Sequence, residues 1–146
     1  MRLYTIGFTQ KTAEEFFNLL KSNHVQRLAD IRLRPDGQLA GFAKKDDLPY
    51  FLLHLADGCQ YVHLPMLAPT KEILDGYRGD HNWPRYVAVF EALMDQRGIP
   101  AGLDKGEFDR LATCLLCSES TAEKCHRRLV AERLAAYWPD LDVIHL

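Results

Sequence analysis

The feature that most constrains the fold is a strand–helix–strand pattern within the first 32 residues. Residues 2–6 and 26–32 are predicted to be strands, and residues 12–22 carry Phe16 and Leu20 at helical spacing between them. A βαβ unit of this length implies a parallel strand pair joined by a right-handed crossover. The chain is therefore expected to build a sheet whose faces are covered by helices.

The same alternation continues to the end of the sequence. Further strands are expected at 59–64, 113–117 and 142–146, with helices at 46–57, within 68–80, and at 83–96, 106–112 and 120–137, and a loop at 38–45. Thr12 followed by Glu15 predicts a capping box, and Ser120 followed by Glu123 predicts another, unless the last helix begins nearer Glu123. The pattern predicts one domain over residues 1–146, a three-layer α/β fold with a mainly parallel central sheet flanked by helices.

Composition and charge narrow the class of protein. The chain is 47% hydrophobic and 26% charged with a formal net charge of −2, which gives no global reason to expect nucleic-acid binding. No apolar run approaches the roughly 18 residues of a membrane span, and the first residues do not resemble a signal peptide. Four cysteines in such a chain are not expected to form a disulfide framework. We therefore expect a cytoplasmic protein without a membrane partner.

The stretch from Leu115 to Arg128 concentrates reactive residue types at one strand-to-helix junction. Cys117 and Glu119 follow the predicted strand at 113–117, just as Gly7, Arg32, Arg34 and His63 lie at or after the ends of the earlier strands. The carboxyl ends of parallel strands share one edge of a sheet, where ligands usually bind. The sequence therefore predicts that these residues converge on one site.

Two cysteines of this stretch are candidates for catalysis. Cys125 is expected early in the last helix, where the helix dipole and the nearby Arg127 favour a thiolate. Cys117 and Cys125 are accordingly predicted as nucleophile or redox thiols, with Glu119 and His126 as candidate acid–base groups. The alternative is a pair of buried, inert thiols, with Glu119 paired to Arg127 and His126 on a helix face.

Three arginines and one glycine are candidates for ligand binding. Arg32, Arg34 and Arg127 could hold a phosphate or carboxylate, since strand alternation places the first two on one face. The alternative for Arg32 or Arg34 is a surface pair with Asp30 or Asp36. Gly7 is expected either to allow close approach of a ligand or to form a tight turn.

The sequence also bears on metal binding and base stacking. Cys114 and Cys117 form C-x-x-C before Cys125 and His126, but residues three apart on a strand point to opposite faces, so no four-ligand metal site is predicted. A looser site from Cys117, Cys125 and His126 stays open, and the sequence indicates no particular cofactor. Tyr77, Trp83 and Tyr86 stand among Arg78, His81 and Arg85, a pattern that fits base stacking or, more often, a packed helix start.

Motifs spread over nearly the whole chain resemble the DUF488 family. They are Thr5-Ile6-Gly7, Asp30-Ile31-Arg32 with Arg34-Pro35, Tyr61-Val62-His63-Leu64-Pro65, Leu115-Leu116-Cys117-Ser118-Glu119, and Cys125-His126-Arg127. The resemblance implies an α/β fold and a site at these motifs, but not an activity, because the family is largely uncharacterised. Phe8 and Thr9 stand where the family often has His-Ser, and Leu67-Ala68-Pro69 replaces its Leu-Gly-Gly.

The sequence leaves three functions open. The first is a small α/β protein with an anion-binding, cysteine-containing site, which as an enzyme would act on a phosphate- or carboxylate-bearing small molecule or nucleotide. The second is a nucleic-acid-associated module that uses the same arginines on phosphates, against which the pI of about 6.3 argues. The third is a protein-interaction domain, favoured if the edge pocket is absent.

Overall fold

A five-stranded, all-parallel sheet forms the centre of the molecule. The computed structural model describes all 146 residues, and its strands are β1 (Arg2–Gly7), β2 (Arg27–Asp30), β3 (Gln60–His63), β4 (Thr113–Cys117) and β5 (Asp142–His145). Their order in the sheet is β3-β2-β4-β1-β5, and every neighbouring pair is parallel. The strand β4, which comes much later in the sequence than β1 and β2, therefore lies between them.

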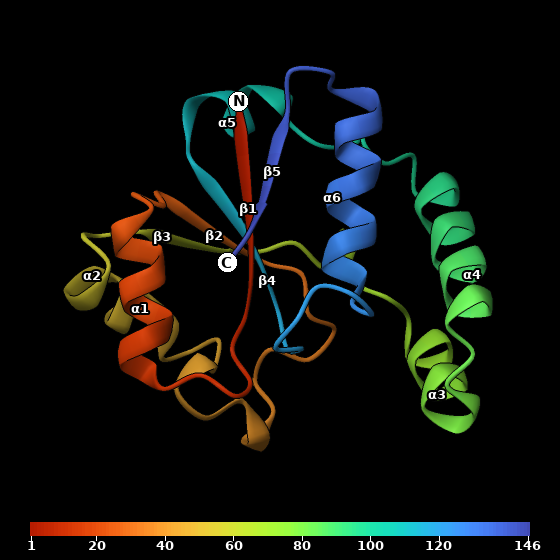
Figure 1. Ribbon diagram of the computed structural model, residues 1–146, viewed down its shortest axis with the longest axis horizontal. Coiled ribbons are helices and arrows are strands. Elements are labelled where there is room, and N and C mark those ends of the chain that lie inside the picture. The colour runs from red at the N-terminus through yellow and green to blue at the C-terminus, as the bar shows by residue number, and fades with distance from the viewer.

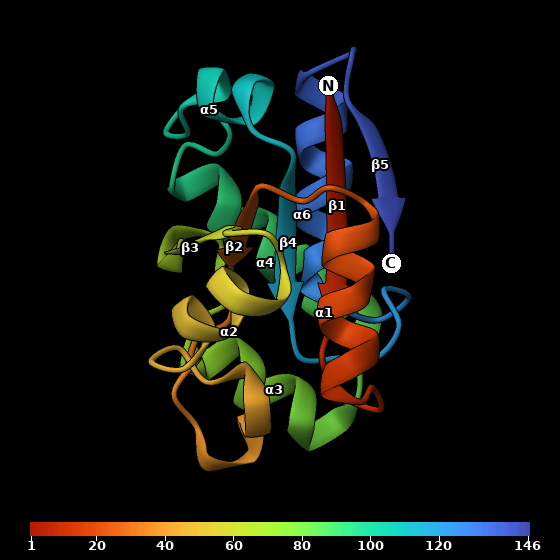
Figure 2. The ribbon, with the colours of Figure 1, turned by 90° about the vertical axis from the view of Figure 1, so that its left-hand side faces the viewer.

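Helices cover both faces of the sheet, so the predicted three-layer α/β fold is confirmed (Figure 1). The first layer holds α1 (Ala13–Ser22) and α2 (Leu48–Leu55). The opposite layer holds α3 (Lys71–Asp80), α4 (Trp83–Gln96), α5 (Lys105–Arg110) and α6 (His126–Tyr137). Figure 2 shows α1 and α2 in front of the sheet, with α6 and α4 behind it.

Alternation along the strands divides the core into two halves. Tyr4 and Ile6 of β1 pack in the half below α1, whereas Leu3 packs in the half below α6. On β4, Cys114 lies in the first half and Leu115 in the second. Both halves consist of buried apolar side chains, which supply most of the driving force for folding.

Several predicted element bounds are confirmed, and others are wrong, among them the strand expected at 26–32, which ends at Asp30. The strand at Thr113–Cys117 and the helix at Trp83–Gln96 begin and end where the sequence pattern places them. The expected loop at 38–45 instead contains two short 3₁₀ turns within Gln38–Ala43, joined at Gly41. The last helix starts at His126 with Cys125 as its N-cap residue, so Ser120 and Glu123 form no capping box.

The capping box at the start of α1 is present and should contribute measurably to stability. The Thr12 hydroxyl accepts from the Glu15 N–H at 3.1 Å, and the Glu15 carboxylate accepts from the Thr12 N–H at 3.1 Å. We expect Thr12→Ala to lower the free energy of unfolding by about 1 kcal/mol. Urea denaturation measures this loss, and an unchanged midpoint would contradict it.

The topology opens a crevice at the carboxyl edge of the sheet. The chain leaves β1 and β2 toward the layer of α1 and α2, but it leaves β4 toward the layer of α6. Neighbouring strands whose connections diverge in this way leave room between them for a ligand.

None of the helices has both the length and the apolar character that a membrane span requires.

Candidate functional site

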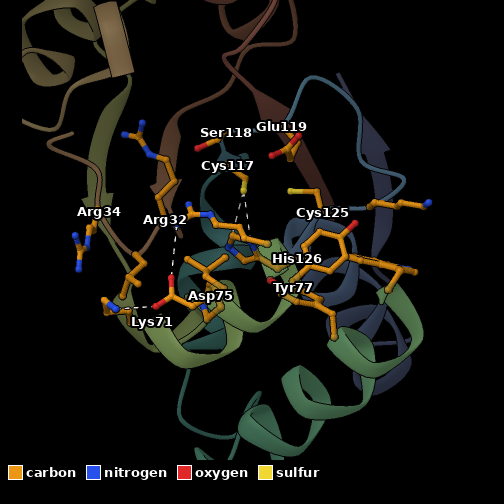
Figure 3. A pocket seen from close by; sticks show the side chains of 17 residues that line it. Arg32, Arg34, Lys71, Asp75, Tyr77, Cys117, Ser118, Glu119, Cys125 and His126 are labelled. Atoms are coloured by element: carbon orange, nitrogen blue, oxygen red, sulfur yellow. Dashed lines mark hydrogen bonds and ion pairs between the residues drawn. The ribbon is translucent and has the colours of Figure 1, made fainter. Parts of the chain in front are cut away.

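A pocket of about 250 Å³ lies at this carboxyl edge. Its floor and walls come from the loops after β2 and β4, the start of α6, and the helices α3 and α4 (Figure 3). The lining residues are Arg32, Leu33, Arg34, Pro69, Lys71, Leu74, Asp75, Tyr77, Arg78, Trp83, Tyr86, Cys117, Ser118, Glu119, Lys124, Cys125 and His126. The four predicted catalytic residues, Cys117, Glu119, Cys125 and His126, are thus brought together.

A thiol pair and an imidazole form the buried part of the pocket. Cys117 ends β4, Cys125 caps α6 and His126 begins it, and all three residues are buried. The two sulfur atoms and a ring nitrogen of His126 lie within 4.8 Å of one another. The Sγ atom of Cys117 is 3.4 Å from Nδ1 of His126. Both cysteines are free thiols.

A backbone carbonyl sets the protonation pattern of His126. Nε2 of the ring lies 2.8 Å from the carbonyl oxygen of Ile31. Because a carbonyl oxygen only accepts hydrogen bonds, Nε2 carries a proton, and Nδ1 of the neutral ring is an acceptor that faces Cys117. His126 is therefore positioned to take the thiol proton of Cys117.

The pKa values of Cys117 and Cys125 are shifted in opposite directions. A hydrogen bond from Cys125 lowers the pKa of Cys117; burial opposes this effect, while the N–H groups of Ser118 and Glu119 and the charge of Arg127 add to it. The same hydrogen bond, together with burial, raises the pKa of Cys125 well above the ordinary thiol range. The pair therefore loses its first proton readily and its second only with difficulty, with the thiolate on Cys117.

Arg127 lies behind the thiol pair and does not line the pocket. Its side chain is fully buried, and its guanidinium donates to the Thr5 hydroxyl, to the carbonyl oxygen of Glu119 and, at 3.7 Å, to Sγ of Cys125. It forms no ion pair with any carboxylate. Arg127 is thus a buried cation beside two thiols, and its contact with Glu119 is through the main chain.

Gly7 allows the loop after β4 to pass directly over the end of β1. A Cβ atom at this position would lie 1.6 Å from the carbonyl oxygen of Glu119 and 2.8 Å from Nη1 of Arg127. Thr9 fixes the same loop, since its N–H and hydroxyl both donate to the carbonyl oxygen of Ser118, at 3.1 and 2.6 Å. The close approach expected at Gly7 is therefore made by the protein's own backbone, and no tight turn is involved.

Arg32 is held in a buried network instead of being free in the pocket. Its Nε and Nη2 donate to both carboxylate oxygens of Asp30, at 2.9 and 2.7 Å, and the hydroxyl of Tyr61 donates to the same carboxylate. His63 binds the carbonyl oxygen of Arg32 at 3.0 Å. The alternative pairing with Asp30 is therefore the one adopted, and the arginine shapes the pocket wall.

Strand alternation does not place Arg32 and Arg34 on one face, because β2 ends at Asp30. Arg34 is exposed at the pocket rim and, like Lys124 and Glu119, forms no ion pair. Lys71 and Arg78, by contrast, are paired with Asp75. Arg34 and Lys124 are therefore the cations available to a ligand. Lys124, which our site prediction missed, stands between the two motifs that carry the thiols.

An aromatic row forms one wall of the pocket. Trp83 and Tyr86 stack with their ring centroids 5.1 Å apart, and Tyr77 meets both rings edge-on or tilted. These rings pack against the apolar core, as expected for a packed helix start, and they also line the pocket. The wall suits a ligand with a flat or apolar part.

The donor atoms of Cys117, Cys125 and His126 are of the types that Zn²⁺ takes. Cys114 cannot join them, because it faces the opposite half of the core. A C-x-x-C metal site is therefore excluded by the strand on which both cysteines lie. Thiol measurements on this protein call for treatment with a chelator beforehand.

Comparison with known proteins gives one finding. A family profile described as "Domain of unknown function DUF488" matches residues 12–134, which include the thiol pair, His126, Arg127 and the pocket walls. No curated protein and no solved structure matches the chain significantly. The site must therefore be interpreted from its own chemistry.

Proposed function

Because the chain belongs to the DUF488 family, whose description assigns no activity, we propose a function from the geometry of the pocket. We propose that the protein is an enzyme in which the thiolate of Cys117 attacks a small molecule that carries a phosphate or carboxylate. In this proposal Arg34 and Lys124 bind the anionic group, and the aromatic wall contacts the rest of the molecule.

The buried charge of Arg127 is the observation that carries this proposal. Burying a guanidinium without a counter-ion costs several kcal/mol, so such a cation is normally paired. Here no carboxylate pairs with it, and the nearest groups able to carry negative charge include the thiols of Cys117 and Cys125. A thiolate at this point supplies the missing charge, whereas two inert thiols would not.

The neighbouring groups support an assignment of roles. His126 accepts the proton that leaves Cys117, since its Nδ1 faces the sulfur at 3.4 Å. Cys125 donates a hydrogen bond that stabilises the thiolate. Glu119, exposed at the pocket rim without an ionic partner, is a further candidate acid–base group.

The structure offers few contacts for the alternative function, a nucleic-acid-associated module. Arg127 is fully buried and Arg32 is bound to Asp30, so neither is free to contact a phosphate backbone. Of the three arginines predicted to bind phosphate, only Arg34 remains exposed. Phosphate contacts supply most of the affinity in such modules, so we favour a small ligand.

The test is the rate of alkylation as a function of pH, on chelator-treated protein. Because thiolate is the reactive form and the pKa of Cys117 is lowered, we expect one fast thiol whose rate is half-maximal below the free-cysteine value of about 8.5. Cys117→Ser should remove the fast reaction. Cys125→Ala should keep it but move the midpoint to higher pH, because the hydrogen bond from the Cys125 thiol is lost.

Controls separate this thiol from the others. Cys59→Ala and Cys114→Ala should leave the fast reaction unchanged, since both cysteines lie buried in the other half of the core. Iodoacetate should react unusually fast relative to neutral iodoacetamide if Arg34 and Lys124 attract anions. Absence of a fast thiol, or a fast thiol that survives Cys117→Ser, would overturn the proposal.

A further inference from the structure

We infer that Cys125 resolves the covalent intermediate on Cys117, so that the site performs thiol–disulfide exchange with a disulfide whose ends carry carboxylates. This inference rests on the proposed function and names its substrate class. It depends on the placement of the second thiol, on the groups that surround Cys117, and on the two unpaired cations at the rim.

The first observation is the reach between the thiols. The sulfur atoms of Cys117 and Cys125 lie within 4.8 Å of each other, and a disulfide needs about 2 Å. Cys125 has extended backbone at the end of a segment, residues 118–125, that is neither helix nor strand. Because this segment has no regular secondary structure, we expect the part next to Cys125 to move enough for the two sulfur atoms to bond.

The second observation concerns the hydrogen-bond donors around the nucleophile. The backbone N–H groups of Ser118 and Glu119, which follow the nucleophile in the chain, help to lower the pKa of Cys117. Acyl transfer needs free donors for a developing oxyanion, and exchange between sulfur atoms does not. A second thiol beside the nucleophile would also intercept a thioester unproductively, whereas it completes the exchange from a mixed disulfide.

The third observation is the charge at the rim. Arg34 and Lys124 are exposed, line the pocket and lack carboxylate partners, and the aromatic wall lines the same pocket. An anionic disulfide places its carboxylates on these cations and its sulfur atoms over Cys117. A neutral disulfide of similar size gains nothing from them.

The steps balance in atoms and electrons. The Cys117 thiolate attacks one sulfur of the substrate, so the substrate S–S bond breaks, a mixed disulfide forms and the first thiolate leaves. His126 passes the proton it took from Cys117 to the first leaving thiolate or to water, so that Nδ1 is free again. Cys125 then gives its proton to Nδ1 of His126 and attacks the Cys117 sulfur, and the second thiolate leaves. Two electrons pass to the substrate, and an external dithiol reduces the Cys117–Cys125 disulfide for another turnover.

The experiment follows a single reaction of chelator-treated, reduced protein with dithiobis(nitrobenzoate), an aromatic disulfide with a carboxylate on each ring. The wild type should rapidly release two thionitrobenzoate ions per molecule and keep no adduct. Mass spectrometry of its peptides should show Cys117 linked to Cys125. Cys125→Ser should release one ion and keep the other half of the reagent on Cys117.

Each other outcome has a separate meaning. A wild type that keeps the adduct on Cys117 without a link to Cys125 overturns the resolving role but leaves the nucleophile intact. A wild type with no rapid release overturns the proposed function as well. Cys114→Ala, on the same strand as Cys117 but facing the other half of the core, is the matched control and should behave as the wild type.

A separate experiment tests whether Arg34 and Lys124 bind the carboxylates of the disulfide. Arg34→Gln and Lys124→Gln should each slow the reaction with dithiobis(nitrobenzoate) several-fold, with little effect on neutral hydroxyethyl disulfide. Equal slowing with both reagents would show that the variants disturb the thiols, and no slowing with either would show that the cations do not bind the substrate. Either result overturns the carboxylate part of the inference.

Discussion

Gly7→Ala is expected to destabilise the protein by about 3 kcal/mol and to abolish fast alkylation of Cys117. The added Cβ would occupy the position of the Glu119 carbonyl, 1.6 Å away, so the loop after β4 must move off the end of β1. That movement breaks the hydrogen bond from Arg127 to Glu119 and displaces the N–H groups beside Cys117. Urea denaturation and alkylation kinetics measure the two effects.

Gly79→Ala provides the matched control for this substitution. Gly79 lies in α3, where a Cβ atom meets nothing within 4 Å, so the change should leave alkylation unchanged and stabilise the helix by up to about 1 kcal/mol. A Gly7→Ala protein with wild-type stability and wild-type thiol kinetics would show that the loop is not held as the structure places it.

Arg127→Met is expected to slow alkylation of Cys117 at neutral pH by about tenfold or more. The positive charge of Arg127 helps to lower the pKa of Cys117, so its removal raises that pKa and decreases the fraction of thiolate. A shift of about one pH unit corresponds to about tenfold in rate. The measurement is the full pH profile, in which the midpoint should rise while the rate at high pH recovers.

Two further variants separate the charge of Arg127 from its packing. Arg127→Lys keeps the positive charge and should restore part of the shift in midpoint. Arg133→Met makes the same substitution farther along α6, where the guanidinium binds Glu91 and Asp95, and should lower stability without moving the midpoint. An Arg127→Met midpoint equal to that of the wild type would contradict the proposed electrostatic role.

Those parts of the fold that depend on local pattern could be predicted from the sequence. The capping box at Thr12 and the bounds of α4 follow from side chains a few residues apart, and the apolar run of β4 is bounded by polar residues. The start of α6 could not be predicted this way. Residues 120–123 carry a helix-start pattern, but the contacts of the loop with Thr9, Gly7 and Arg127 keep the segment before His126 out of the helix.

The location of the candidate site could be predicted from the sequence better than the roles of its residues. Parallel strands bring their ends to one edge, so Cys117, Glu119 and Arg34 were expected to meet there. Nothing in the local sequence distinguishes a buried arginine from an exposed one. Arg127 in the first turn of α6 and Arg32 beside Asp30 were therefore both assigned to ligand binding, although the first lies behind the pocket and the second is bound to a carboxylate.

The strand order also has a consequence for how the protein is made. Leu3 of β1 lies opposite Thr113 on one side and Val143 on the other, so the centre of the sheet joins segments that are synthesised far apart in time. Pairings between such distant segments form slowly. Until β4 and α6 have docked, Cys117 and Cys125 have neither the cover of Arg127 nor the loop over Gly7. A growing chain therefore exposes both thiols to oxidants in its surroundings before the folded pocket controls which partners reach them.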